Sequence, residues 1–225
     1  MLFAGGSGSY GKDDKQYTIY TTAQLKVLPT LTLSIGPQFT RDIEETQWIG
    51  NFSDPASAET YSTRYVFAHL NQDLLAADIR ADWILSPTLS CQIYIQPLIA
   101  SGSYADFKYL VKPGSYDYNN YGENGSTLTQ NKSGDGKITS YGLDPDGSGP
   151  APSQEVSNPD FRYISLRGNA VLRWEYLPGS ALYLVWTQSR QNIEPDGQFM
   201  FGRSFNNLFS IRPDNIFMLK VTYWL

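Results

Sequence analysis

Apolar and polar residues alternate along most of this chain. In 215–225 every second residue from Phe217 to Leu225 is apolar, and Lys220 and Thr222 lie between them. A period of two is the signature of a β-strand with one apolar face. Segment 2–10, rich in Gly and Ser, is a weaker candidate strand. The strong candidate strands are 17–27, 31–40, 75–85, 89–96, 164–177, 181–190 and 215–225.

The connections between these segments alternate between short and long. Tight turns that contain proline are predicted at 28–30, 86–87 and 178–179. In contrast, 41–71 and 191–213 are predicted to be long, irregular connections, with a possible short strand at 63–68, and 101–160 is rich in Gly, Asn, Asp and Ser. Short turns at one end and long loops at the other are typical of outer-membrane β-barrels.

Aromatic residues gather just before the tight-turn end of three strands that run in the same direction. These strands place the aromatic side chains at one height, which is the arrangement of an interfacial aromatic girdle. The girdle candidates are Trp83, Trp174, Tyr176, Tyr223 and Trp224.

These patterns predict an all-β fold, an antiparallel transmembrane β-barrel of the outer membrane, with 1–225 as a single domain. Short turns would be periplasmic, and 101–160 would be a long outer loop or a plug. Eight strands close the smallest barrels. However, the weak strand at 2–10 and a start that lacks the features of a signal peptide favour a fragment, the C-terminal seven or eight strands of a larger barrel. The alternative is a soluble secreted β-sandwich.

Composition excludes several classes of protein. The net charge of −5 leaves no basic footprint for a nucleic-acid partner. The single cysteine, Cys91, excludes an internal disulfide and a cysteine-based metal cluster. A transmembrane helix needs about 18 consecutive apolar residues, and the sequence contains no such run.

The polar sides of the predicted strands carry charges in mid-strand, and these residues are candidates to line a lumen. Fixed charges along a pore tune its ion preference. The alternative, which the sequence favours, is an ion-paired interior that fills the lumen and conducts nothing. The lumen-lining candidates are Asp78, Arg80, Asp82, Gln92, Arg167, Asn169, Arg173, Glu175 and Lys220.

The first half of 101–160 is rich in tyrosine. Aromatic faces stack on sugars, so these side chains either contact glycans or fold the loop into the lumen as a plug. The candidates are Tyr104, Tyr109, Tyr116, Tyr118 and Tyr121. The second half of 101–160 holds Asp135-Gly136, Asp144 and Asp146-Gly147, a weak calcium signal whose spacing fits no EF-hand. Asp-Gly is also an ordinary turn pair, so no cofactor or metal is predicted.

His69 is the only histidine and the only candidate base for a hydrolase. A serine hydrolase needs a Ser–His pair with an orienting acid, and no serine partner stands out in the sequence. A structural role for His69 is therefore favoured, and the protein is not predicted to be an enzyme.

Several segments from about residue 65 onward resemble a known family. They are 65–72, 86–90, 96–102, 144–152, 158–161, 166–176, 178–180, 185–190 and 212–217. They are similar to the C-terminal part of a bacterial envelope family called domain of unknown function 5916. Its full-length members resemble a signal peptide, a β-sandwich similar to carbohydrate-binding module family nine, and a large outer-membrane barrel. The resemblance implies a location in the bacterial outer membrane and missing upstream parts, but it supplies no catalytic residues.

Residue patterns and resemblance together predict an integral outer-membrane β-barrel with a porin-like transport role or a surface-anchoring role. Its surroundings would be membrane lipid and lipopolysaccharide. Carbohydrate, other envelope proteins and the missing N-terminal part are the expected partners. The alternative is a secreted carbohydrate-binding β-sandwich, and an outer-membrane hydrolase is the weakest hypothesis.

Overall fold

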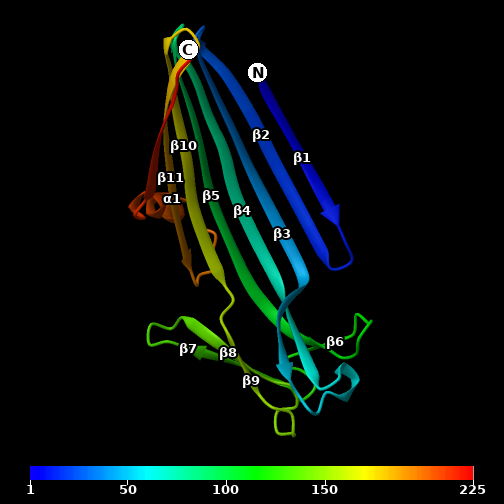
Figure 1. The fold of residues 1–225 in the computed structure, drawn as a ribbon. Helices are drawn as coiled ribbons and strands as arrows, with labels where there is room; N and C mark the ends of the chain where they lie inside the picture. Colours follow the sequence, from blue (N-terminus) through cyan, green and yellow to red (C-terminus); the bar gives the residue numbers. More distant parts are fainter. Residues whose placement is uncertain (225) are drawn as a thin grey trace.

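A computed structural model describes residues 1–224, and it consists almost entirely of antiparallel β-structure (Figure 1). The main sheet is a meander in the order β1-β2-β3-β4-β5-β10-β11-β12. Its strands are β1 (Leu2–Tyr10), β2 (Asp14–Leu28), β3 (Leu31–Ser53), β4 (Thr63–Ser86), β5 (Leu89–Leu110), β10 (Phe161–Leu177), β11 (Ser180–Glu194) and β12 (Asp214–Thr222). The predicted all-β antiparallel fold is therefore confirmed.

The two ends of this meander do not meet. Within residues 1–224, β1 and β12 are the two edges of the main sheet and do not pair with each other, so the sheet is not closed into a barrel. The weak segment 2–10 does form a strand, and Gly5 leaves room there for the ring of Tyr20 on β2. At the other edge β12 ends at Thr222, and Leu225 lies outside the described residues.

The three predicted proline turns share one design. They are Pro29-Thr30, Pro87-Thr88 and Pro178-Gly179, and the register shifts by one residue just before each. The hairpins are also joined to one another, because the N–H groups of Ile84 and Glu175 donate 2.8 Å hydrogen bonds to the carbonyl oxygens of Thr30 and Thr88. The tight turns therefore lie together at one end of the sheet, called here the turn end (Figure 1).

At the far end, the structure corrects two expectations of irregular chain. β3 and β4 run through most of 41–71, and only a short tip with the 3-10 helix η1 (Ala58–Thr60) separates them. Two bulges in β3, near Glu45 and Ile49, break the period of two and hide this hairpin in the sequence. Residues 101–160 hold the end of β5, the short strand β6 (Tyr118–Asn120), and a second sheet of β7 (Thr127–Lys132), β8 (Ile138–Asp144) and β9 (Gln154–Ser157).

The second sheet packs on the far end of the main sheet (Figure 1). Val66 and Ala68 of β4 are fully buried there, in one cluster with Phe107. From the second sheet, Tyr141 and Leu143 complete this core. Because Val66 and Ala68 are an even number of residues from Arg80 on the continuous strand β4, the second sheet covers the same face that carries Arg80.

The connection from β11 to β12 folds over the opposite face and contains helix α1 (Phe201–Ser210). Leu208 of α1 is fully buried against Ile99 and Ile164. The start of this connection is held by Arg162, which is 2% exposed, bonds Asp196 at 2.8 Å and pairs with Glu194.

No helix within residues 1–224 is long and apolar enough to cross a membrane.

Arg162→Gln is predicted to release the β11–β12 connection. Removing one partner of a buried ion pair costs about 3–5 kcal/mol, because the remaining charges stay uncompensated. Trypsin cleavage after Arg203, within α1, should become much faster. The exposed pair of Arg173 with Glu175 gives the control, since Arg173→Gln should leave this cleavage rate unchanged. Equal cleavage of wild type and Arg162→Gln would show that Arg162 is not the anchor.

Gly179→Ala is predicted to destabilise the protein by about 1–2 kcal/mol, because Gly179 has φ +77° and a left-handed conformation is costly for other residues. Its new Cβ would also lie 3.2 Å from Cβ of Trp224. Thr30→Ala changes the matching turn residue, whose φ is not positive, and should have a smaller effect. The urea midpoint of unfolding measures both, and equal midpoints would contradict the argument.

Candidate functional site

The main sheet has one polar and one apolar face, and the register assigns each candidate residue to one of them. Directly paired residues on neighbouring strands share a face. Arg80 pairs with Tyr94, and Tyr94 pairs with Asn169. The face that carries them is called here the inner face. Lys220, Tyr183 and Arg173 form a paired row on it nearer the turn end. All the predicted lumen-lining residues lie on this face: Asp78, Arg80, Asp82, Gln92, Arg167, Asn169, Arg173, Glu175 and Lys220.

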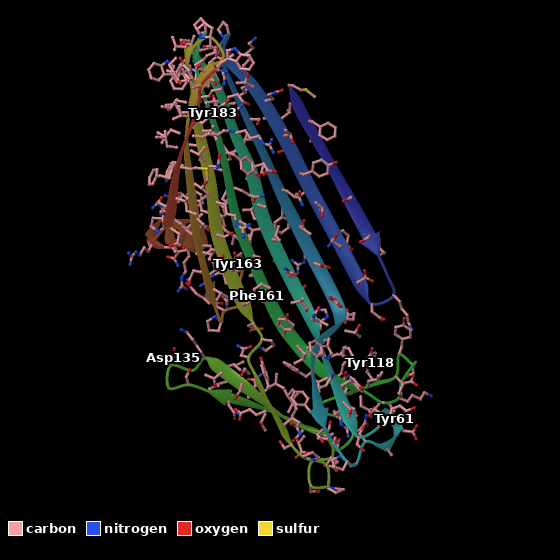
Figure 2. The ribbon with its side chains drawn as sticks, in the orientation of Figure 1. Tyr61, Tyr118, Asp135, Phe161, Tyr163 and Tyr183 are labelled. Carbon is pink, nitrogen blue, oxygen red and sulfur yellow. The ribbon has the colours of Figure 1, made fainter. Side chains whose placement is uncertain are left out.

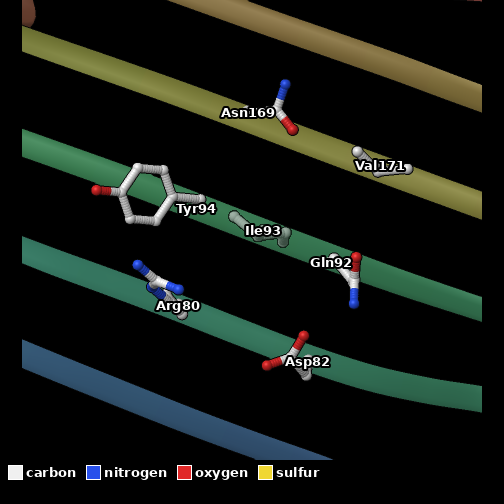
Figure 3. A pocket seen from close by; sticks show the side chains of 7 residues that line it. All are labelled: Arg80, Asp82, Gln92, Ile93, Tyr94, Asn169 and Val171. Atoms are coloured by element: carbon white, nitrogen blue, oxygen red, sulfur yellow. The ribbon is translucent and has the colours of Figure 1, made fainter.

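The inner face is hollowed at its centre. A depression of about 360 Å³ lies over β4, β5 and β10, and Figure 3 shows its lining side chains. Four of the predicted residues line it together with Tyr94 and Val171: Arg80, Asp82, Gln92 and Asn169. Ile93 also borders it, although its pairing with Ala81 and Ala170 directs its side chain to the opposite face. Tyr94 was not predicted as a site residue, although it alternates with Ile93 and Ile95 in the sequence.

Tyr94 organises one side of this hollow. Its hydroxyl donates a hydrogen bond to Asp78, and the guanidinium of Arg80 lies over its ring, 4.9 Å from the centroid. Asn169 is held by a 3.0 Å bond from its amide nitrogen to Oγ1 of Thr187. Among the residues that the structure describes, neither Arg80 nor Asp82 takes part in an ion pair. Both charges are exposed on the open face.

Nearer the turn end the charges are paired instead. Arg173 lies 2.8 Å from Glu175 and 3.4 Å from the hydroxyl of Tyr183. The amine of Lys220 lies 5.7 Å from the centroid of the same tyrosine ring. The inner face therefore combines a paired cluster near the turns with unpaired charges in the central hollow.

The opposite face, called here the outer face, is apolar across seven strands. One paired row runs through Leu25, Leu33, Ala81, Ile93, Ala170, Trp186 and Phe217. Most of the large members of this row are more than a third exposed. Between the turn end and α1, no element of the described residues covers this face.

The predicted girdle residues lie at the turn end. Trp83 and Trp174 are on the outer face and about half exposed, while Tyr223 and Trp224 are still more exposed. Tyr176 donates a hydrogen bond of 3.1 Å to the carbonyl of Thr222 and lies beside the ring of Trp174. The five aromatic residues are thus brought together at one level of the sheet.

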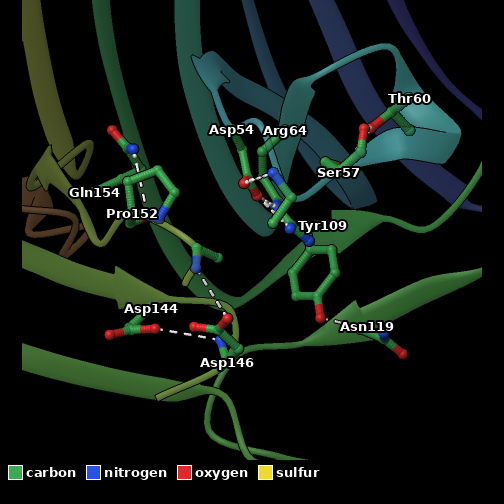
Figure 4. A network of polar contacts seen from close by, with 12 residues as sticks. Asp54, Ser57, Thr60, Arg64, Tyr109, Asn119, Asp144, Asp146, Pro152 and Gln154 are labelled. Atoms are coloured by element: carbon green, nitrogen blue, oxygen red, sulfur yellow. Dashed lines mark hydrogen bonds and ion pairs between the residues drawn. The ribbon is translucent and has the colours of Figure 1, made fainter. Parts of the chain in front are cut away.

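The predicted glycan-contact tyrosines are mostly parts of the core at the far end. Tyr121 is 7% exposed, and burial raises its pKa. Tyr109 packs on Tyr121 and under the guanidinium of Arg64, which is paired with the buried Asp54 (Figure 4). Tyr104 and Tyr118 are partly buried as well. Of the five, Tyr116 alone is exposed, with the amine of Lys12 lying 3.6 Å from its ring centroid.

The three weak calcium candidates do not form a site together. Asp135 lies at the tip of the β7–β8 hairpin (Figure 2). The hydroxyl of Ser133 donates a hydrogen bond to its carboxylate, and this bond lowers the pKa of Asp135. Asp144 and Asp146 instead accept bonds from backbone N–H groups of the loop before β9 (Figure 4). No group of three or more potential metal ligands is found within residues 1–224.

His69 is engaged on both ring nitrogens. Nδ1 donates to Glu45 Oε2 at 3.0 Å, and Nε2 accepts from the amide of Asn71 at 3.2 Å. The bond to His69 lowers the pKa of Glu45. These contacts include no serine, so the geometry supplies no Ser–His pair.

A larger groove of about 860 Å³ lies between the second sheet and residues 194–203. Its carboxylates include Glu194 and Asp196, which both form ion pairs with Arg162. Asp160 also lines it and accepts the N–H of Tyr104 at 2.7 Å, while burial raises its pKa. Because its carboxylates serve this packing, the groove is a weaker site candidate than the hollow of the inner face.

Comparison with known proteins identifies a family and no individual relative. No curated protein and no solved structure matches the chain. A family model described as Domain of unknown function (DUF5916) matches residues 4–225, and the chain belongs to that family.

Proposed function

We propose that this chain forms part of the wall of an outer-membrane β-barrel, with its outer face against lipid and its inner face against a water-filled passage. The observation that carries the proposal is the contrast between the two faces of one continuous sheet. The outer face presents unbroken apolar rows, and the inner face presents charges at the same height. Strands that alternate between lipid and a wet lumen need this pattern.

The β-sandwich alternative requires a second sheet over the apolar face. The second sheet, β7–β9, packs instead on the far end of the inner face, where Val66 and Ala68 are buried. An exposed apolar area as large as the outer face marks an interaction surface or a membrane surface. The aromatic level at the turn end adds support for a membrane surface.

The inner face supports a transport role better than a filled interior. An interior that conducts nothing would pair its charges, as Arg173 and Glu175 do. Arg80 and Asp82 instead line the central hollow without an ion-pair partner among the described residues, and Tyr94 and Asn169 line it beside them. This lining suits the passage of small polar solutes, and its unpaired charges would set an ion preference.

The free edges of the sheet favour a larger assembly. A bilayer does not tolerate the unpaired backbone groups of β1 and β12, so further strands would have to complete the barrel. A location in the bacterial outer membrane follows from this proposal. Anchoring a carbohydrate-binding domain at the cell surface is a second role that the same barrel would serve.

Ile93 and Gln92 are neighbours that project to opposite faces, and they test the orientation. Ile93→Lys would place a charge in the lipid, which costs about 2–4 kcal/mol near the bilayer centre. Gln92→Lys would place the same charge in the lumen and should be nearly neutral. The readout is the urea midpoint of the intact protein folded into phospholipid vesicles. Equal midpoints for the two variants would overturn the proposed orientation.

The unpaired charges test the transport role. In planar bilayers under a salt gradient, Arg80→Gln should shift the reversal potential toward cation preference, and Asp82→Asn should shift it toward anion preference. Arg203→Gln removes an exposed charge on α1, away from the inner face, and should cause no shift. A wild-type protein that inserts but conducts nothing would instead support the anchoring role.

A further inference from the structure

Helix α1 has three distinct sides. Ser204 and Leu208 are fully buried against the outer face of the sheet. Phe201, Phe205 and Phe209 are spaced four residues apart and therefore share the adjacent side. Their ring centroids are 5.7 and 5.2 Å apart in succession, and each ring is 41% to 56% exposed. The remaining side is polar and carries Arg203, Asn206 and Asn207.

A slot of about 260 Å³ lies between this helix and strands β3–β5. Every residue that lines it is apolar, with Phe201 and Phe205 forming its cover. Ala77 lies on the floor of the slot and pairs with Pro37 of β3. The larger side chains of Leu75 and Ile79 line the slot before and after Ala77 on the same face of β4. The slot exists because the small side chain of Ala77 lies between the larger side chains of Leu75 and Ile79 on one face of β4.

The slot lies about one membrane thickness from the turn end. Leu75 beside the slot and Trp83 of the girdle are eight residues apart on β4, which is roughly 26 Å along a strand. A strand tilt of about 35–45° reduces this to roughly 20 Å of height, close to the apolar band of about 25 Å in such barrels. The ring of Phe39, which pairs with Leu75, meets Phe199 at 6.0 Å on the same level.

We propose that the slot under α1 holds one acyl chain of a membrane lipid, and that α1 lies at the boundary between acyl chains and headgroups. This proposal rests on the proposed orientation of the sheet in the membrane. Helices with one apolar and one polar side lie at this boundary. Here Phe201, Phe205 and Phe209 would face the acyl chains, and Arg203 would face the headgroup phosphates.

The chemistry of the slot selects an alkyl chain as its occupant. Its wholly apolar lining offers no hydrogen-bonding side chain to a sugar or an ion. Its volume is below the roughly 300 Å³ at which small-molecule sites begin, so it admits a slender chain and not a folded partner. Its floor also continues into the apolar rows of the outer face through Ile79, so a chain would enter sideways from the bilayer.

Native mass spectrometry of the intact protein in detergent, incubated with dipalmitoyl phosphatidylethanolamine, tests the slot. One lipid should remain bound under collisional activation that strips all others. Ala77→Phe fills the floor and should lower the retained lipid by about tenfold, equivalent to about 1.4 kcal/mol. Ala81→Phe adds the same bulk to the same strand and face outside the slot, and should retain the lipid.

A wild-type protein that retains no lipid, or only detergent, would overturn the slot, as would equal retention by Ala77→Phe. If Ala77→Phe does not fold, Phe205→Ser opens the cover without adding bulk, and it must show the same loss. Co-flotation with vesicles separates the two proposals. A protein that floats with vesicles but holds no lipid refutes the slot alone, and one that holds the lipid without floating refutes the membrane orientation alone.

Discussion

The two-residue alternation of the main sheet between the turn end and the second sheet, held in register across eight strands, is the constraint on which the rest of the structure depends. A slip of one residue in any hairpin would exchange the two faces of that strand. Arg80 would then project among the apolar rows, and Ile79 would project into the hollow. The proline turns prevent this, because each closes its hairpin with two residues and one bulge. The bonds from Ile84 to Thr30 and from Glu175 to Thr88 then align one hairpin with the next.

The two faces are capped by different means at their far ends. On the inner face, β4 is apolar at Val66 and Ala68, so the second sheet has a surface to bury. On the outer face, the β11–β12 connection covers Ile99 and Ile164 with Leu208, and Arg162 fixes its start. Both additions come from connections between strands, so they leave the register of the meander unchanged.

The sequence was sufficient where alternation is regular and insufficient where it is interrupted. The strands near the turn end, the proline turns and the grouping of Asp78, Arg80, Asp82 and Asn169 on one face all follow from a period of two. Tyr94 follows the same period, between Ile93 and Ile95, but it is not among the predicted site residues. The tyrosines of 101–160 looked like a binding surface, yet Tyr109 and Tyr121 form a core, because sequence does not reveal which rings a distant strand will cover.

Bulges and short elements account for the other differences. The two bulges in β3 concealed the hairpin within 41–71, and the strands of the second sheet are too short to show a clear period. Helix α1 did leave a signal, since Phe201, Phe205 and Phe209 recur at helical spacing. Its ten residues lie in a segment rich in Gly and Asn, and its position on the outer face depends on Leu208 meeting strands far away in the sequence.

The hollow of the inner face lies at a height between two groups of aromatic residues. One group is at the turn end, and the other consists of the phenylalanines of α1. Arg80 and Asp82 lie on β4 between Leu75, near the level of α1, and Trp83 at the turn end. If these levels mark the edges of an apolar layer, the two unpaired charges lie within its thickness. An unpaired charge buried without water is very costly, and their backbone neighbours Ile79 and Ala81 face the opposite way. Under the proposed orientation, the inner face would therefore meet water along this height, and the hollow of Tyr94 and Asn169 would belong to a wet passage.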